Sequence, residues 1–81
     1  NSREVITVMA TLLDETGALQ ALLAGISAAG ASIVTINQAT PENGAAQVAV
    51  SVRTGTMQMS VEEMMSRLVR QRTVVEVHRG L

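Results

Sequence analysis

The chain has 81 residues, the length of one small domain, with six basic and seven acidic residues and a formal net charge of −1. This near-neutral balance argues against general binding of polyanions. Because Phe, Tyr and Trp are absent, the core must be built from aliphatic side chains and Met, which bury less area each. We therefore expect self-association to add buried surface. With no cysteine and one histidine, the sequence excludes disulfides and a zinc cluster, and we expect no metal or cofactor.

We expect residues 1–81 to form a single domain of a longer protein with an N-terminal segment, because the chain begins at Asn1 rather than Met. The weakly polar stretch from Ala18 to Ile36 is mostly Ala, Gly and Ser, which is too polar for a membrane helix. No signal segment is visible, so we expect a cytoplasmic protein without membrane contact. We also expect no binding of RNA, because RNA-binding sheets stack bases on aromatic rings.

The first half of the chain predicts strand, helix and strand. Residues 4–13 alternate and are rich in Val, Ile and Thr, as in a strand with one apolar face. After a break, Leu19, Leu22, Leu23 and Ile26 follow at helical spacing. Gly30 is the residue type that ends a helix in the left-handed conformation, and a second strand is expected over 32–39.

The second half predicts a hairpin, a helix and a last strand. Residues 40–44 read TPENG, which is turn chemistry, and Val48, Val50 and Val52 alternate beyond it. Ser60 and Glu63 form a capping box, in which each side chain is expected to bind the other residue's backbone N–H. The helix that follows has a Glu63–Arg67 pair one turn apart. Residues 73–79 predict a strand with Val75 and Val77 on one face.

The predicted order is β-α-β-β-α-β. With right-handed crossovers, this order folds into a four-stranded antiparallel sheet with both helices on one face. We therefore predict an α+β protein of the ferredoxin-like class. This fold supports many functions, so it does not decide the chemistry.

The corner between the first strand and the first helix carries the chemical signal. It reads Asp14-Glu15-Thr16-Gly17-Ala18-Leu19, which places the N-terminus of a helix at the end of a sheet. Free backbone N–H groups there bind small anions. We expect the N–H groups of Gly17, Ala18 and Leu19 to hold a carboxylate, with Asp14 and the Asn37 carbonyl as acceptors for an ammonium group. Gly17 lets the backbone approach a ligand closely.

These residues resemble the ACT domain, an amino-acid-sensing regulatory module. The resemblance rests on the element order, the corner from Asp14 to Leu19, and Ile36-Asn37-Gln38 at the end of the second strand. Within that family, three segments are similar to the small PheB-like proteins, which are often labelled chorismate mutase: Thr35-Ile36-Asn37-Gln38, Pro41-x-Asn43-Gly44 and Met57-x-Met59-Ser60-x-Glu62-Glu63-Met64. The resemblance implies a cytoplasmic homodimer that binds an amino acid, such as phenylalanine, between subunits.

Carried over residue by residue, the resemblance implies a ligand held by one subunit's corner and the other's second strand. The corner contributes Asp14, Thr16, Gly17, Ala18 and Leu19, and the strand contributes Asn37. Thr16 departs from the family pattern, which has Pro there, and makes the corner less rigid.

Purely structural roles for the same residues also remain open. Asp14 has an alternative role as a turn or helix-cap residue, and Asn37 as an amide that satisfies a strand end. Two other functions also remain, namely a dimerisation domain without a ligand and a chorismate mutase. Against the mutase, no group of Arg residues accompanies the corner to bind two carboxylates.

Overall fold

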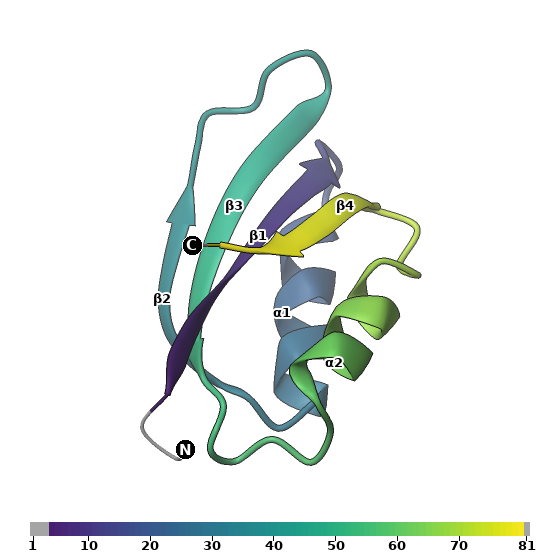
Figure 1. Cartoon of the computed structure of the whole chain (residues 1–81). Coiled ribbons are helices and arrows are strands. Elements are labelled where there is room, and N and C mark those ends of the chain that lie inside the picture. The colour runs from purple at the N-terminus through teal and green to yellow at the C-terminus, as the bar shows by residue number, and fades with distance from the viewer. Residues whose placement is uncertain (1–3, 81) are drawn as a thin grey trace.

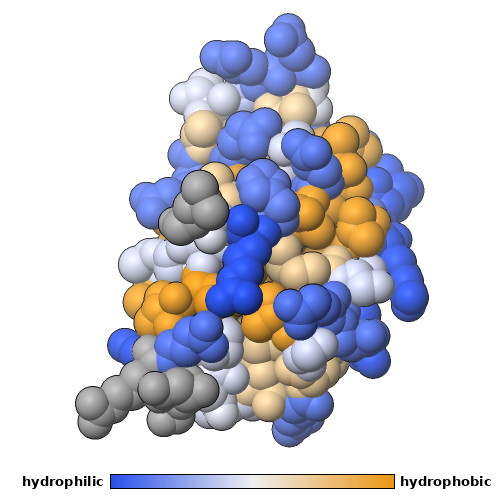
Figure 2. Space-filling model, viewed as in Figure 1, coloured by the Kyte–Doolittle hydropathy of each residue, from blue (hydrophilic) through white to orange (hydrophobic). Residues whose placement is uncertain are grey.

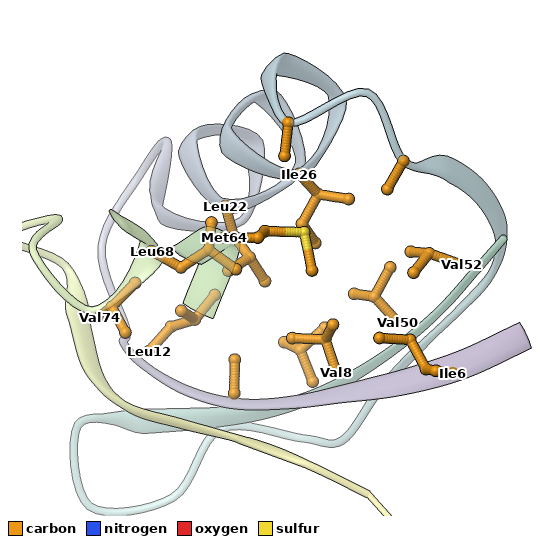
Figure 3. Packing of buried hydrophobic residues seen from close by; sticks show 14 of the residues in the cluster. Ile6, Val8, Leu12, Leu22, Ile26, Val50, Val52, Met64, Leu68 and Val74 are labelled. Atoms are coloured by element: carbon orange, nitrogen blue, oxygen red, sulfur yellow. The ribbon is translucent and has the colours of Figure 1, made fainter. Parts of the chain in front are cut away.

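The computed structural model describes residues 4–80 and has the predicted element order (Figure 1). Its elements are β1 (Val5–Leu13), α1 (Ala18–Ala28), β2 (Ser32–Gln38), β3 (Ala45–Arg53), α2 (Val61–Leu68) and β4 (Val74–Arg79). The sheet has the strand order β2-β3-β1-β4, and every neighbouring pair is antiparallel. Both helices lie on one face of the sheet (Figures 1 and 3). The ferredoxin-like prediction is confirmed.

The core fills the space between the sheet and the two helices (Figure 3). Alternate residues of β1 point into it, and each is 5% exposed or less. From α1, Leu22 and Ile26 are fully buried, whereas Leu19 and Leu23 at the edge of the stripe are only partly buried. Met64 and Leu68 of α2 complete the cluster at 1% exposure each. The side chains that fill the core are therefore aliphatic or Met, as the composition requires.

Gly30 lies where the turn after α1 packs against the loop between β3 and α2. Its φ of 89° is left-handed, as a helix C-terminus favours. A Cβ atom there would lie 2.7 Å from the carbonyl oxygen of Thr56, whose hydroxyl donates to the Gly30 carbonyl at 2.6 Å. The Gln58 N–H also donates to the Ala29 carbonyl at 3.1 Å. Gly30 therefore ends α1 and lets the β3–α2 loop pack against this turn.

The β2–β3 hairpin closes through a two-residue turn. Asn43 and Gly44 both have positive φ, at 55° and 79°. Glu42 and Ala45 exchange two backbone hydrogen bonds of 2.9 and 3.0 Å. This is the tight turn for which an Asn-Gly pair is suited.

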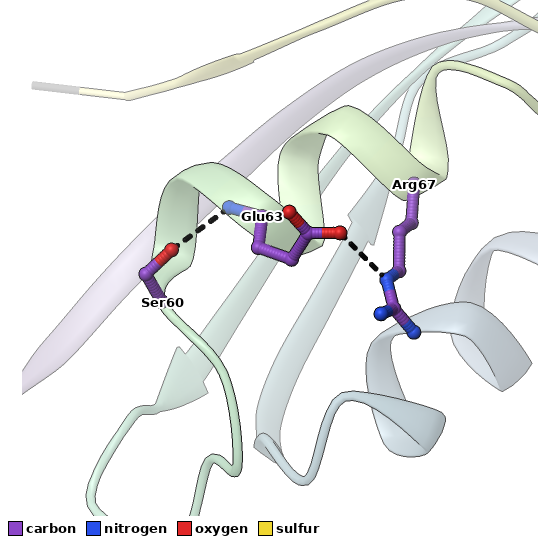
Figure 4. Close-up of polar contacts among 3 residues, drawn as sticks. All are labelled: Ser60, Glu63 and Arg67. Atoms are coloured by element: carbon purple, nitrogen blue, oxygen red, sulfur yellow. Dashed lines mark hydrogen bonds and ion pairs between the residues drawn. The ribbon is translucent and has the colours of Figure 1, made fainter.

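The N-terminus of α2 is capped by Ser60, but only one arm of the predicted capping box forms (Figure 4). The Glu63 N–H donates to the Ser60 hydroxyl at 3.0 Å. The Glu63 carboxylate instead accepts from Nε of Arg67 at 2.9 Å, which confirms the predicted pair. The predicted bond from the Ser60 N–H to the Glu63 carboxylate is wrong, because Arg67, one turn further along the helix, binds this carboxylate instead.

The prediction for β4 was wrong at one residue. The register between β1 and β4 shifts between Thr11 and Leu12, so a bulge interrupts the alternation. Val74 faces the core at 7% exposure, whereas Val75 is 55% exposed. Val77 keeps its expected inward position and packs against the core.

Apolar residues reach the surface in separate patches between hydrophilic ones on the side shown in Figure 2. Within residues 4–80, no helix is both long and apolar enough to cross a membrane.

Candidate functional site

The corner between β1 and α1 is held in place by backbone hydrogen bonds to two other loops. The Leu13 N–H donates to the Thr73 carbonyl at 2.8 Å, and the Asp14 N–H donates to the Gly44 carbonyl at 2.9 Å. The Gly44 bond extends the β1–β3 ladder by one residue, and the Thr73 bond reaches the loop before β4. These bonds therefore hold the corner in one position relative to the end of the sheet.

Gly17 is the N-cap residue of α1, and its φ of 87° is left-handed. No side chain caps the helix, so the cap alternative for Asp14 is wrong, and Asp14 lies instead in the bend that follows β1. The Ala18 N–H donates to the Glu15 carbonyl at 3.1 Å and is not free for a ligand, contrary to expectation. Among the hydrogen bonds of residues 4–80, the N–H groups of Leu19 and Gln20 have no protein acceptor. These are the donors that the first turn of α1 presents.

A hollow of about 300 Å³ lies at this corner, at the small end of the range for ligand sites. One wall is the corner itself, another is the first turn of α1, and the rest comes from the ends of β2 and β3. The residues that line it are Leu12, Leu13, Asp14, Glu15, Gly17, Ala18, Leu19, Gln20, Gln38 and Ala46. Polar groups thus converge on an otherwise aliphatic cavity.

The two acidic residues of the hollow differ in their partners. Glu15 accepts two hydrogen bonds from the Arg72 guanidinium, at 2.8 and 3.3 Å. These bonds and the positive charge lower the pKa of Glu15, while burial opposes the shift. The Asp14 carboxylate is exposed and forms no hydrogen bond or ion pair within residues 4–80. Asp14 is therefore the open anionic acceptor of the site.

The structure brings most of the predicted site residues together, but not all of them. Asp14, Gly17, Ala18 and Leu19 line the hollow, whereas Thr16 does not. Asn37 pairs with Ala49 on the face of the sheet that the helices leave open. Within one chain, Asn37 therefore does not face the corner, and a contact from it would need a second copy; that contact stays a prediction.

Four polar residues at or beside the hollow are not among the predicted site residues: Glu15, Gln20, Gln38 and Arg72. Gln38 pairs with Val48, a core residue, and so lies on the helix side of the sheet. Side chains alternate along β2, so Gln38 had to lie on the other face of the sheet from Asn37. That face is the one that the helices cover, and this was the sequence signal that could have identified Gln38 as a residue of the hollow. Arg72 is 57 residues from Glu15, and no local pattern announces that pair.

No group of three or more His, Cys, Asp or Glu side chains that could hold a metal ion occurs in the described part of the chain. The hollow instead combines backbone donors, one free carboxylate, two amide side chains and aliphatic walls. Such a set of groups suits a small zwitterion with an apolar side chain better than a metal or a large anion.

Solved structures with this architecture define the class of the fold. The chain superposes on the ACT domain of a GTP pyrophosphokinase from Chlorobium tepidum with a TM-score of 0.73 and 17% identity, over 94% of this chain and 96% of that one. It superposes on the C-terminal domain of the MgtC protein from Mycobacterium tuberculosis with a TM-score of 0.72 and 11% identity, over 99% and 88%. The chain has the ferredoxin-like ACT fold.

Sequence relatives agree with the fold. The chain is 37% identical over 59 residues to a UPF0735 ACT domain-containing protein of Halalkalibacterium halodurans, covering 73% of this chain and 40% of that protein. A relative from Caldicellulosiruptor saccharolyticus is 40% identical over 67 residues, covering 83% and 45%. A third, from Thermoanaerobacter, is 34% identical over 74 residues, covering 91% and 51%.

No family model matches the chain. The chain spans about half the length of the curated relatives it matches, or somewhat less. Both comparisons support its assignment as an ACT domain. The narrower likeness to the PheB-like proteins stays a prediction.

Proposed function

We propose that this chain is a regulatory module that binds a free amino acid at the β1–α1 corner and works as a homodimer. The observation that carries the proposal is the hollow, where the free Asp14 carboxylate lies beside the open N–H groups of Leu19 and Gln20. An α-amino acid presents one ammonium and one carboxylate on the same carbon. The ammonium would bind Asp14, and the carboxylate would bind the helix N-terminus.

The walls of the hollow favour an apolar side chain of moderate size. Leu12, Leu13, Leu19 and Ala46 supply its aliphatic surface. Arg72 is already bound to Glu15, so the site has one free anionic acceptor rather than a cluster of cations. This arrangement fits an amino acid such as phenylalanine, and it does not fit a dianionic substrate such as chorismate. A place in phenylalanine metabolism is part of the proposal.

The proposed dimer uses the free edge of β2. This strand contains no charged residue, and Val34 and Ile36 are 44% and 43% exposed. The neighbouring helix α1 also lacks charged residues. The other free edge, β4, is shorter and carries charged side chains, which protects it from pairing.

The hydrogen bonding of β2 limits the register of the proposed pair. The Ala39 N–H donates to the Gln47 carbonyl, so Ala39, Asn37 and Thr35 bond toward β3, and Ile36 and Gln38 between them present their backbone groups outward. Val34 lies at the bulge between Ile33 and Thr35. An antiparallel pair centred on the exposed Ile36 places this residue opposite its own symmetry mate.

Gln38 belongs to this edge and also to the hollow. A ligand that binds Gln38 would therefore change the pairing edge, which gives a physical route for regulation.

Thermal unfolding across the twenty amino acids, chorismate and prephenate tests the ligand. A ligand at about 100 times its Kd adds about 2.7 kcal/mol, which raises Tm by about 10–20 °C in a domain of this size. We expect one apolar amino acid to give this shift, Asp14→Asn to abolish it, and the control Glu62→Gln on α2 to keep it. No shift with any compound would leave a dimerisation domain without a ligand. A selective shift with chorismate or prephenate would contradict the amino-acid proposal.

Disulfide trapping tests the dimer, since the chain has no native cysteine. Paired residues in the expected register have Cα atoms about 5.5 Å apart, within disulfide reach. Oxidised Ile36→Cys should therefore form a covalent dimer. The control Val34→Cys should not, because its symmetry mate would lie four residues along the strand. Equal trapping of both variants would contradict the register.

A further inference from the structure

The face of the sheet opposite the helices carries a second hollow. It has a volume of about 360 Å³ and is lined by Met9, Asn37, Gln38, Ala39, Gln47, Val48 and Ala49. Ala49 is the small residue beneath it. On the neighbouring strand, Met9 pairs directly with Ala49. The long, flexible side chain of Met9 therefore lies next to a hollow above Ala49 that could receive a side chain of the same kind.

Four polar side chains of this face are already paired with one another. The hydroxyls of Thr7 and Ser51 lie 3.3 Å apart, and the Thr11 hydroxyl donates to Gln47 at 3.0 Å. Covering these groups costs less than covering unpaired ones, because each keeps a partner when water leaves. On this face the paired strands β1 and β3 carry one charged residue, Arg53, at the end of the ladder where it pairs with Val5; the rows around Met9 and Ala49 carry none.

From these observations we propose that a second copy of the chain packs against this face, sheet on sheet, with Met9 of each copy filling the hollow above Ala49 of the other. Two sheets stack about 10 Å apart, which leaves room for one layer of interlocking side chains from each. The surface is thus self-complementary, as a two-fold interface must be.

The register of the sheet decides the direction of the two-fold axis. One row across the open face reads His78, Met9, Ala49, Asn37, on β4, β1, β3 and β2 in turn. An axis parallel to the strands places β1 over β3 of the other copy, so Met9 meets Ala49 and His78 meets Asn37. An axis across the strands would place Met9 on Met9, with no hole to receive it.

The same axis also keeps the charged strand of each copy away from its symmetry mate. Glu76 and His78 lie on this face of β4, which would cover the uncharged β2 of the second copy. The face measures about 19 Å across four strands and about 20 Å along them, a flat footprint of about 400 Å² per copy. Together the two footprints cover about 800 Å², the area of a weak and transient contact. This contact is separate from the β2 edge proposed above.

A swap of the two residues provides the test. In an Ile36→Arg background, which blocks the β2 edge, sedimentation velocity follows the association of this face alone. Met9→Ala removes the side chain that fills the hollow, and Ala49→Met fills the hole. Each single change should weaken dimerisation at least tenfold. The double variant Met9→Ala/Ala49→Met should restore it, because side chain and hole have only exchanged strands.

Gln58→Arg, in an exposed loop away from this face, is the control and should dimerise like the parent. Unfolding curves of every variant show that the fold is kept. The proposal is overturned if Ile36→Arg is monomeric throughout the accessible concentration range, or if the double variant is as weak as the singles. Either result leaves the β2-edge dimer standing, since that dimer is measured in the chain with Ile36 intact.

Discussion

Arg72 holds Glu15 by two hydrogen bonds, 2.8 Å from Nη2 to Oε1 and 3.3 Å from Nη1 to Oε2. The pair links the β1–α1 corner to the loop before β4. The backbone bond from Leu13 to Thr73 joins the same two segments. Side-chain and backbone contacts therefore position the corner that lines the candidate ligand site.

This ion pair makes the stability of the chain depend on pH. The hydrogen bonds from Arg72 lower the pKa of Glu15 below its ordinary value of 4.5. The pair therefore stabilises the fold above that value and loses its effect as the pH falls through the lowered pKa. We expect Glu15→Gln to lose less stability than the wild type on acidification in this window, by urea unfolding at successive pH values.

The effect should be small and screened by 1 M salt, because both side chains are largely exposed. Glu62→Gln, which removes a carboxylate outside the ion pairs of residues 4–80, serves as the control. An unchanged acid profile in Glu15→Gln would show that the pair does not form in solution.

Gly30→Ala should destabilise the chain more than Gly44→Ala. Both residues have positive φ, so each substitution costs about 1–2 kcal/mol in backbone strain. Only at Gly30 does the new Cβ meet backbone, at 2.7 Å from the Thr56 oxygen, whereas nothing lies within 4 Å at Gly44. Chemical unfolding measures the difference, and equal losses would mean that the Gly30 contact relaxes freely.

Ser60→Ala should cost about 1 kcal/mol, because it removes the acceptor of the Glu63 N–H at the start of α2. Ser66 lies inside the same helix and away from the cap. Because Ala is a better helix former than Ser, Ser66→Ala should be neutral or slightly stabilising. The free energies of unfolding of the two variants separate the cap from helix propensity. A loss in Ser66→Ala as large as that in Ser60→Ala would argue against the cap.

Leu22→Ala should lower the free energy of unfolding by about 3 kcal/mol, since Leu22 is fully buried between α1 and the sheet. Leu23→Ala makes the same chemical change at a partly buried neighbour and should cost clearly less. Urea unfolding followed by circular dichroism measures both. Similar costs at the two positions would show that α1 is rotated relative to the sheet.

The sequence alone determined the order and type of every element. Alternation marked β1 and β3, helical spacing marked α1 and α2, and Gly30, Asn43 and Gly44 marked the turns. These signals are local, because each depends on residues within one or two turns or on alternate positions of one strand. The fold class followed, since few topologies accommodate this order with right-handed crossovers.

Tertiary structure decided what depends on residues distant in the sequence. The bulge that turns Val75 outward arises from pairing with β1, and the Glu15–Arg72 pair joins two loops that meet only in the fold. Pairing with β3 placed Asn37 on the open face and Gln38 in the hollow. Composition and spacing constrain local backbone geometry, whereas the side chains that share a cavity are selected by strand register and helix packing, which form only when the whole sheet assembles.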